Sequence, residues 1–406
     1  DLRMSRGLGD VYKRQLLDNN HKSIISLVPE YGLEKEKEQK EADKLAEYKS
    51  TLTNDELEEL VKKTKELKEY QDTPSSQEDL EKIPMLELSD IKREPAKDYN
   101  DVKSVDGIKI VHHNIFTNKI AYINMSFDTK CVPDELIPYM GLLGSTLSLM
   151  DTKNYTYPEL TNEININCGG LATGTALYSD KVDFSKNTIV YEVKSKALYE
   201  KVPFVLGMME EIMYNTRFDD YKRLKEIIAR IKSRLEASLM GQGHSIAMLE
   251  CCAQFSESAY YSDILRGYKY YEFIKKLDEE FEQNKTQIVD KLNKLVGYIF
   301  NKDNVIVSLT ADDEGYDCFV KALSAKSCNI KDEHYNTAVR SFIPVNVKTG
   351  YTSASQVQYV ARCGNFVKDG YKYTGALKVL KVIFSYDYLW ILSLIHISEP
   401  TRHAQI

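Results

Sequence analysis

Several features that would define a function class are missing from this sequence. No apolar run approaches the ~18 residues that a membrane-spanning helix needs, and the closest lies at residues 388–397. Positive charge does not dominate, because 54 Lys and Arg stand against 61 Asp and Glu, for a net charge of -7. This balance argues against a protein that binds nucleic acid or an anionic membrane, although a basic patch confined to one surface stays open. No signal peptide is visible.

Cysteine is sparse and has no pairing pattern. The seven cysteines are odd in number and scattered along the chain, at positions 131, 168, 251, 252, 318, 328 and 363. No C-x-x-C spacing occurs, and the adjacent Cys251 and Cys252 are best interpreted as buried thiols on a helix. Reduced thiols fit this usage better than a disulfide framework does. We therefore expect a bacterial cytoplasmic location, with an organelle as the alternative if a leader precedes residue 1.

Catalytic motifs are also absent. Neither H-E-x-x-H nor H-x-x-E-H occurs, and such a zinc site needs both His and its Glu on one helix. Two near misses, at 330–334 and 396–400, have Ile330 for the first His and Pro400 for the second, and are treated as coincidence. The Gly-Gln-Gly-His sequence at 241–244 lacks the Lys-Ser/Thr ending of a P-loop, so we interpret it as a break between two packed helices. Neither a G-x-S-x-G elbow nor a Rossmann glycine pattern occurs.

Two adjacent histidines, His112 and His113, fall in a predicted strand. Successive side chains of a strand point to opposite faces, so these two rings are not expected to share one metal ion. A packed or surface histidine pair is the preferred interpretation. The 28 tyrosines, against one tryptophan, follow no RNA-binding motif.

The two ends of the chain do not continue the patterns beside them. Residues 1–15 and 391–406 look like translated adapter or vector sequence, and we exclude both from fold reasoning. Residues 16–32 are expected to be the end of a preceding domain, with a strand at 21–29 that ends at Pro29.

A highly charged segment at residues 33–82 predicts a helical hairpin. From residue 33 to residue 72, 22 of 40 residues are charged, and the apolar residues recur at helical spacing in two narrow stripes. Thr53 and Glu56 form a capping box that starts the second helix. A charged, solvated face is preferred here over nucleic-acid or membrane binding. Residues 83–104 contain Pro84 and show no periodicity, so an extended linker is expected.

The rest of the chain predicts an α+β fold. Residues 105–330 are expected to form a complete α/β domain, an antiparallel sheet with a helical layer on one face. The predicted strands are 108–112, 120–127, 171–178, 188–194 and 305–310, and the predicted helices are 134–150, 157–167, 198–214, 219–240, 245–257, 270–281, 285–300 and 313–325. Residues 340–390 repeat this order, with a strand at 356–362 and a helix at 373–390. This second α/β domain is expected to be truncated after its first helix.

Several segments between residues 16 and 390 carry a family resemblance, in order and without large gaps. They are Leu27-Val28-Pro29-Glu30, Tyr70-Gln71-Asp72-Thr73-Pro74, Lys82-Ile83-Pro84, Val111-His112-His113, Met150-Asp151-Thr152-Lys153-Asn154-Tyr155, Tyr373-Thr374-Gly375-Ala376-Leu377 and Ser385-Tyr386-Asp387-Tyr388-Leu389-Trp390. Together they resemble the presequence-protease branch of the pitrilysin-like (insulinase) metallopeptidases. The resemblance is to the C-terminal half of these proteins, including the peptidase-associated domain.

The resemblance implies a clam-shaped enzyme that encloses a chamber. Two halves, each of two pitrilysin/LuxS-like α/β sandwich domains, would be joined by the hairpin as a hinge. In this family the zinc ligands and the general base belong to an H-x-x-E-H helix and a later Glu in the first domain, and the fourth domain adds an Arg and a Tyr. None of these falls on a position of this sequence. We therefore expect no catalytic, cofactor-binding or metal-ligating residue here, and no activity of this chain alone.

The resemblance also implies a function for the parent protein, a zinc metalloendopeptidase that degrades short unstructured peptides. Zinc would be held by the intact parent and not by these residues. The expected partners are unstructured peptide substrates and the missing N-terminal catalytic half, with no nucleic acid and no membrane. The alternative is a non-catalytic pitrilysin-like binding or scaffold subunit.

Overall fold

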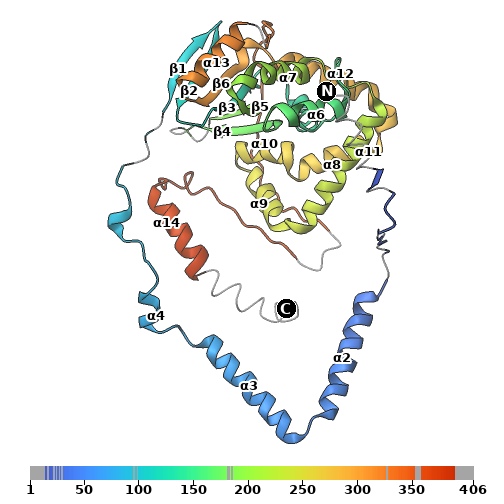
Figure 1. Cartoon of the computed structure of the whole chain (residues 1–406), viewed down its shortest axis with the longest axis vertical. Coiled ribbons are helices and arrows are strands. Elements are labelled where there is room, and N and C mark those ends of the chain that lie inside the picture. Colours follow the sequence, from blue (N-terminus) through green and yellow to red (C-terminus); the bar gives the residue numbers. More distant parts are fainter. Residues whose placement is uncertain are drawn as a thin grey trace. The chain divides into compact units, whose positions relative to one another are not determined.

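The computed structural model describes residues 14–15, 18–21, 23, 25–26, 28, 31–94, 97, 99–180, 183, 186–325, 328–352 and 358–388 (Figure 1). The chain divides into two compact units, residues 1–95 and 96–406. The interpretation of both chain ends as foreign sequence lies outside the described residues, apart from residues 14–15. No helix in the described ranges combines the length and the apolar character needed to cross a bilayer.

Charged helices make up most of the first unit. The helices α2 (Leu33–Thr51) and α3 (Asn54–Asp72) are followed by the short α4 (Gln77–Glu81) and a 3₁₀ turn at Leu88–Asp90. Neither α2 nor α3 buries a residue. Within this unit, their helical state therefore depends on local interactions.

Thr53 begins α3 through the predicted capping box. The Thr53 backbone N–H donates to Glu56 Oε2 at 2.8 Å, and the Glu56 N–H donates to Thr53 Oγ1 at 3.3 Å. These bonds, the backbone one first, hold the pKa of Glu56 below its usual value. One turn along the helix, Lys63 lies 2.9 Å from Glu59 in a favourable i,i+4 pair.

The second unit is built on a six-stranded sheet with the order β1-β2-β6-β3-β5-β4. Among the described strands, β2 and β6 pair in parallel, and the other neighbours are antiparallel. The strands are β1 (Asp101–Val105), β2 (Ile108–Asn114), β3 (Ile120–Asp128), β4 (Leu171–Ser179), β5 (Asn187–Leu198) and β6 (Val305–Ala311). β1 and β4 are therefore the edge strands.

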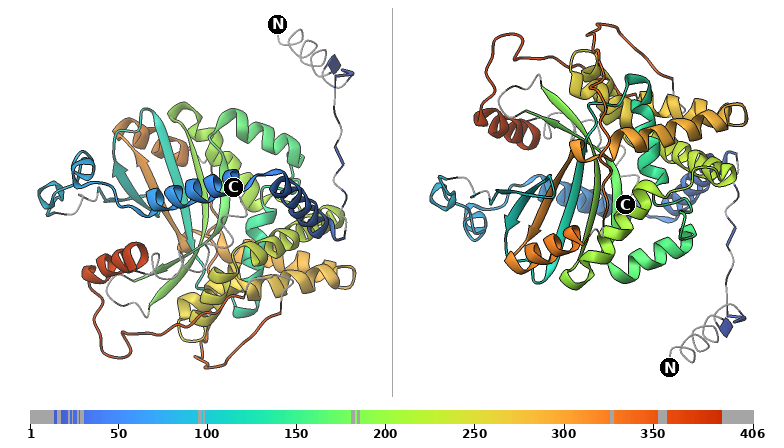
Figure 2. Two further views of the ribbon diagram at one scale, coloured as in Figure 1. Left: turned by 90° about the horizontal axis from the view of Figure 1, so that it is seen from below. Right: turned by 90° about the horizontal axis from the view of Figure 1, so that it is seen from above.

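Helices cover one face of this sheet, which Figure 2 shows from two directions. Side chains on that face are buried in register across the strands, as in the row Ile110, Val307, Met125 and Val193. The packed helices are α5 (Ile137–Thr146), α6 (Tyr157–Asn167), α7 (Val202–Tyr214), α8 (Tyr221–Gly241), α9 (Gly243–Ala253), α10 (Glu257–Arg266), α11 (Tyr268–Glu279), α12 (Phe281–Ile299) and α13 (Asp313–Ser324). This mixed architecture confirms the predicted α+β class.

An aromatic cluster lies in the core between the sheet and the helices. Phe300 has no exposed surface, and its ring meets those of Phe127, Tyr191 and Tyr214 edge-on, at centroid distances of 5.1, 5.5 and 6.1 Å. Edge-to-face contacts of this kind add to the stabilisation from burial alone. The cluster joins strands β3 and β5 to the ends of α7 and α12.

Several of the predicted elements differ from the structure. β1 lies inside the predicted linker 83–104, and α10 was missing from the prediction. No strand forms at the described residues of 21–29 or of 356–362, where an isolated strand has no partner for its backbone groups. The last helix is shorter than predicted, with α14 at Gly375–Ile383 followed by a π-helical turn at Phe384–Tyr388.

Candidate functional site

The largest cavity found among the described residues lies in the second unit, where α5, β4, α8 and α10 meet. Its volume is about 710 Å³, within the range typical of small-molecule sites. It is lined by Met140, Gly141, Gly144, Ser145, Ser148, Leu149, Thr173, Gly174, Thr175, Arg230, Ile231, Arg234, Leu235, Leu265, Arg266 and Tyr270. We call this cavity the arginine pocket, after its three arginines.

Glycines on α5 allow the neighbouring elements to approach the arginine pocket closely. A Cβ on Gly144 would lie 3.2 Å from the Cα of Gly174 on β4, and Thr173 Oγ1 donates to the Gly144 carbonyl at 3.1 Å. A Cβ on Gly141 would lie only 2.8 Å from the ring of Tyr270. Because the two glycines are three residues apart on one helix, they form one smooth face against β4 and α11.

Tyr270 brings a buried hydroxyl to this pocket. The residue is 4% exposed, and its hydroxyl has no hydrogen-bond partner among the described residues. Burial raises the pKa of Tyr270, and the positive charge of Arg234 opposes that rise. The hydroxyl therefore stays protonated and is able to donate a hydrogen bond.

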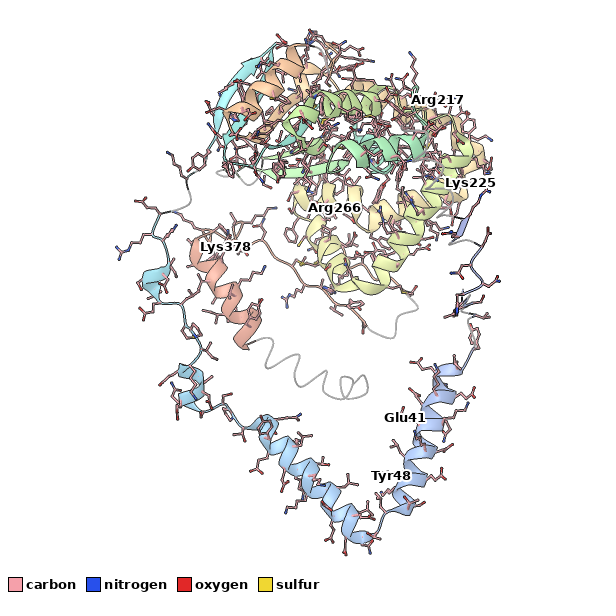
Figure 3. The ribbon with its side chains drawn as sticks, in the orientation of Figure 1. Glu41, Tyr48, Arg217, Lys225, Arg266 and Lys378 are labelled. Carbon is pink, nitrogen blue, oxygen red and sulfur yellow. The ribbon has the colours of Figure 1, made fainter. Side chains whose placement is uncertain are left out.

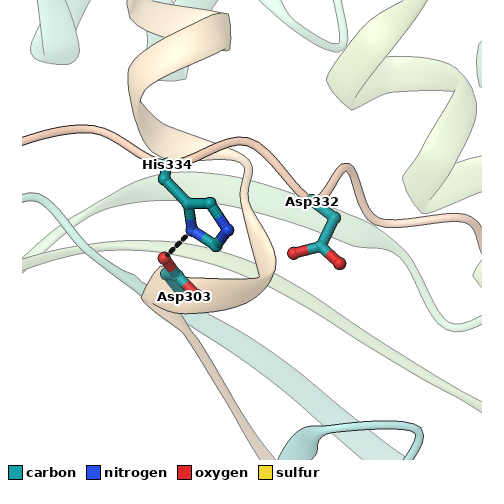
Figure 4. A group of neighbouring side chains, drawn as sticks. All are labelled: Asp303, Asp332 and His334. Atoms are coloured by element: carbon teal, nitrogen blue, oxygen red, sulfur yellow. Dashed lines mark hydrogen bonds and ion pairs between the residues drawn. The ribbon is translucent and has the colours of Figure 1, made fainter.

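One group of side chains has the composition of a weak metal site. Asp303, Asp332 and His334 bring one ligand atom each to within 4.8 Å of one another (Figure 4). All three are exposed, His334 Nδ1 is paired with Asp303, and Lys302 lies 3.9 Å from Asp332. The Asp303 carboxylate raises the pKa of His334, so the group is best described as a surface ion-pair cluster.

The paired histidines have separate structural roles, as predicted. His112 is buried, its Nε2 lies 3.0 Å from the Ala311 carbonyl, and its ring packs on Tyr316 at 4.7 Å. His113 points to the opposite face, where its Nε2 lies 3.0 Å from Ser308 Oγ. The two rings therefore share no ligand.

The other sequence features of interest have structural explanations. All seven cysteines are free, and burial raises the pKa of Cys328 to about 12, which leaves an unreactive thiol. Gln242 separates α8 from α9, so residues 241–244 are the break between helices that the sequence predicts. The sequence interpretation missed the arginine pocket, because its members come from four separate segments. The available signal was the i,i+4 spacing of Arg230 and Arg234 on an amphipathic helix.

Comparisons with known proteins identify the family. The model of the domain associated with peptidases of metallopeptidase family 16, subfamily C, matches residues 27–277. "Protein HypA" of Clostridium perfringens is 37% identical over 386 residues, which are 94% of this chain and 39% of that protein. "Presequence protease 1, chloroplastic/mitochondrial" of Arabidopsis thaliana is 27% identical over 93% of this chain and 35% of its own length.

The fold and these matches define a peptidase-associated α+β protein. The chain belongs to this metallopeptidase-associated family, and the presequence-protease resemblance seen in the sequence is confirmed. It is also similar to "Presequence protease, mitochondrial" of Drosophila melanogaster, at 25% identity over 72% of this chain and 28% of that protein. The chain thus spans about two fifths, or less, of the length of these relatives.

The described residues do not fit a peptidase zinc site. The one donor group among them that is close enough, Asp303, Asp332 and His334, offers a single imidazole and no general base beside it. Zinc in a catalytic site takes three protein ligands, commonly with two or three His, in a shielded pocket. The exposed cluster matches neither requirement, so no catalytic step is assigned to it.

Proposed function

We propose that this chain is the non-catalytic, C-terminal part of a zinc metalloendopeptidase that degrades short unstructured peptides in a closed chamber. The observation that carries the proposal is the family match over residues 27–277, together with relatives named as presequence proteases. In the whole protein, zinc and the general base would be held outside residues 1–406. There the metal would supply an activated water for attack on the peptide carbonyl.

The chain's own contribution would be a wall of that chamber and a hinge. The second unit suits a wall, because one face of its sheet is buried under helices and an aromatic cluster surrounds Phe300. The helices α2 and α3 would act as the hinge between the two halves of the enzyme. Closure of such halves excludes water and completes the site, as lids do elsewhere.

Two measurements test the proposal. Purified chain is expected to contain less than stoichiometric zinc by elemental analysis, and to leave an internally quenched peptide uncut. Cleavage by the chain alone, abolished by a chelator, would overturn the assignment of a non-catalytic part.

The second measurement is the sequence of the source DNA on both sides of the reading frame. An upstream H-x-x-E-H helix supports the peptidase, and joining that segment to this chain is expected to produce zinc-dependent cleavage. An upstream motif that lacks a zinc ligand would instead identify a binding or scaffold subunit.

A further inference from the structure

The charges of the arginine pocket do not resemble those of the rest of the chain. Arg230 and Arg234 lie one turn apart on α8, and Arg266 ends α10 on the opposite side of the cavity. No carboxylate is among the described residues that line this cavity. Three guanidinium groups therefore meet in one place, on a protein whose net charge is -7.

These arginines have almost no partners in the described part of the chain. Arg230 and Arg234 make no ion pair or hydrogen bond there, and Arg266 reaches only the Ser262 hydroxyl, at 3.5 Å. By contrast, Arg217 and Arg223 pair with Asp219 and Glu226. Like charges held together repel one another, so an anion between them would be stabilised.

Neutral donors complete the same wall. Ser145 and Ser148 on α5 line the cavity, and neither hydroxyl has a partner in the described ranges. The buried Tyr270 hydroxyl, which also lacks a partner among the described residues, lies within the influence of the Arg234 charge. Guanidinium and hydroxyl groups are the donors that bind carboxylate and phosphate oxygens in proteins.

The size of the arginine pocket constrains the ligand. A volume of about 710 Å³ is too large for one small inorganic anion with its hydration shell removed. Part of the lining is apolar, supplied by Met140, Leu149, Ile231, Leu235 and Leu265. A fitting ligand therefore carries more than one anionic group, on an organic body that covers the apolar side.

We propose that the arginine pocket binds a compact organic anion with two or more phosphate or carboxylate groups. Arg230, Arg234 and Arg266 would bind its oxygens, and Ser145, Ser148 and the Tyr270 hydroxyl would donate to them. This inference is independent of the proposed peptidase function, since it concerns binding by the described residues alone.

Isothermal titration calorimetry on the full chain tests this proposal, in a low-salt buffer free of phosphate. Pyrophosphate probes phosphate recognition, and citrate probes carboxylate recognition. Saturable one-site binding of either is expected, weakened by added salt because the contacts are ionic. The probe that binds more tightly identifies the source of the anionic groups. If neither probe saturates, the proposal is wrong.

Matched variants separate the arginine pocket from general charge effects. Arg230→Gln and Arg234→Gln are each expected to weaken binding about tenfold, as for loss of one charge-assisted contact. Arg217→Gln removes the same charge from an exposed residue outside the cavity and is expected to leave affinity unchanged (Figure 3 labels Arg217 and Arg266). Equal losses in all three variants would overturn the site.

A further variant fills the cavity without changing charge. Ser148→Leu is expected to reduce binding while the melting temperature and circular dichroism stay as in the parent, because Ser148 makes no internal hydrogen bond in the described ranges. Unchanged affinity in a folded Ser148→Leu variant would place the anion elsewhere. The three arginines are exposed in the free chain, so their variants are expected to fold.

Discussion

The carboxyl groups of Glu250 on α9 and Asp263 on α10 are hydrogen-bonded to each other in the helical layer. Glu250 Oε2 and Asp263 Oδ2 are both buried, and among the described residues no donor from another group gives either atom a hydrogen bond, although the Lys269 ammonium lies 3.5 Å from Asp263 Oδ2. Two facing carboxylates repel unless they share a proton. Burial first, and then the Asp263 carboxyl, raise the pKa of Glu250. The pair is therefore held together by one proton on the Glu250 side.

Replacing Glu250 by Gln is expected to stabilise the second unit at neutral and alkaline pH. A raised pKa means that the folded state binds the proton more tightly than the unfolded state does. The pair is thus stable below the unfolded pKa of Glu, and this stability is lost as the pH rises through the folded pKa. The gain at pH 8 is expected to be on the order of 1 kcal/mol, the cost of one unsatisfied buried polar atom.

Thermal unfolding at pH 4 and pH 8 measures this effect. The difference between Glu250→Gln and the parent is expected to be present at pH 8 and small at pH 4. Glu279→Gln, on the exposed side of α11, is the control, because Glu279 makes only a surface pair with Lys275 at 4.0 Å. A Glu250→Gln variant that is less stable at pH 8 would contradict the shared proton.

Local sequence signals predicted the elements but not their tertiary partners. The Asp106-Gly107 pair, with φ of 50° and 80°, is a typical two-residue hairpin turn, so β1 was readable from the sequence. Its strand was missed because the linker interpretation relied on Pro84 and Pro95, which lie before it. The capping box at Thr53 involves residues three apart and was predicted correctly.

The arginine pocket could not be predicted in the same way. Its walls depend on the close approach of Gly144 to Gly174, a contact between residues far apart in the sequence that no periodicity encodes. Local patterns show which side of α8 is apolar, and the position of Arg266 opposite Arg230 follows only from packing. The missed α10 follows the same logic, since its Leu265 is buried by neighbours distant in sequence.

Glu211 is expected to be a major stabilising residue of the second unit. This carboxylate on α7 is 5% exposed and accepts from the Asn154 N–H at 3.0 Å, Asn154 Nδ2 at 2.8 Å and Asn215 Nδ2 at 2.7 Å. Burial raises the pKa of Glu211, but the hydrogen bonds outweigh burial and hold it below the usual value. Glu211→Ala is expected to cost about 2 kcal/mol by leaving buried donors unpaired.

Urea unfolding of Glu211→Ala at pH 7 and pH 4 checks this role. Because the folded pKa of Glu211 is lowered, its contribution is complete above the unfolded pKa and is lost as the pH falls through the folded pKa. The variant is therefore expected to differ less from the parent in acid. Glu200→Ala, outside this hydrogen-bond group, is the control. A pH-independent difference would assign the loss to packing.

His334 is expected to titrate above the value usual for histidine, because the Asp303 carboxylate stabilises its charged form. Asp303→Asn is expected to lower the pKa of His334 toward 6.5, which NMR of the ring protons measures directly. The ion pair is present below the unfolded pKa and is lost as the pH rises through the folded pKa. Asp332→Asn, which leaves the Asp303 contact intact, is expected to have the smaller effect. Equal shifts in both variants would contradict a specific pair.

The helices of the first unit are expected to be marginal when isolated. A peptide of residues 31–94 contains α2 and α3, which bury no side chain within their unit, and helices without tertiary packing are weak in water. Circular dichroism is expected to show partial helix that decreases when salt screens the i,i+4 pairs. Thr53→Ala removes the cap of α3 and is expected to lower helicity further, by about 1 kcal/mol of helix stability. Thr51→Ala is the control, because the Thr51 hydroxyl bonds only the Tyr48 carbonyl in the last turn of α2. Full helicity that persists in high salt would show that the hairpin folds alone, and would remove the reason to expect that it requires the rest of a larger protein.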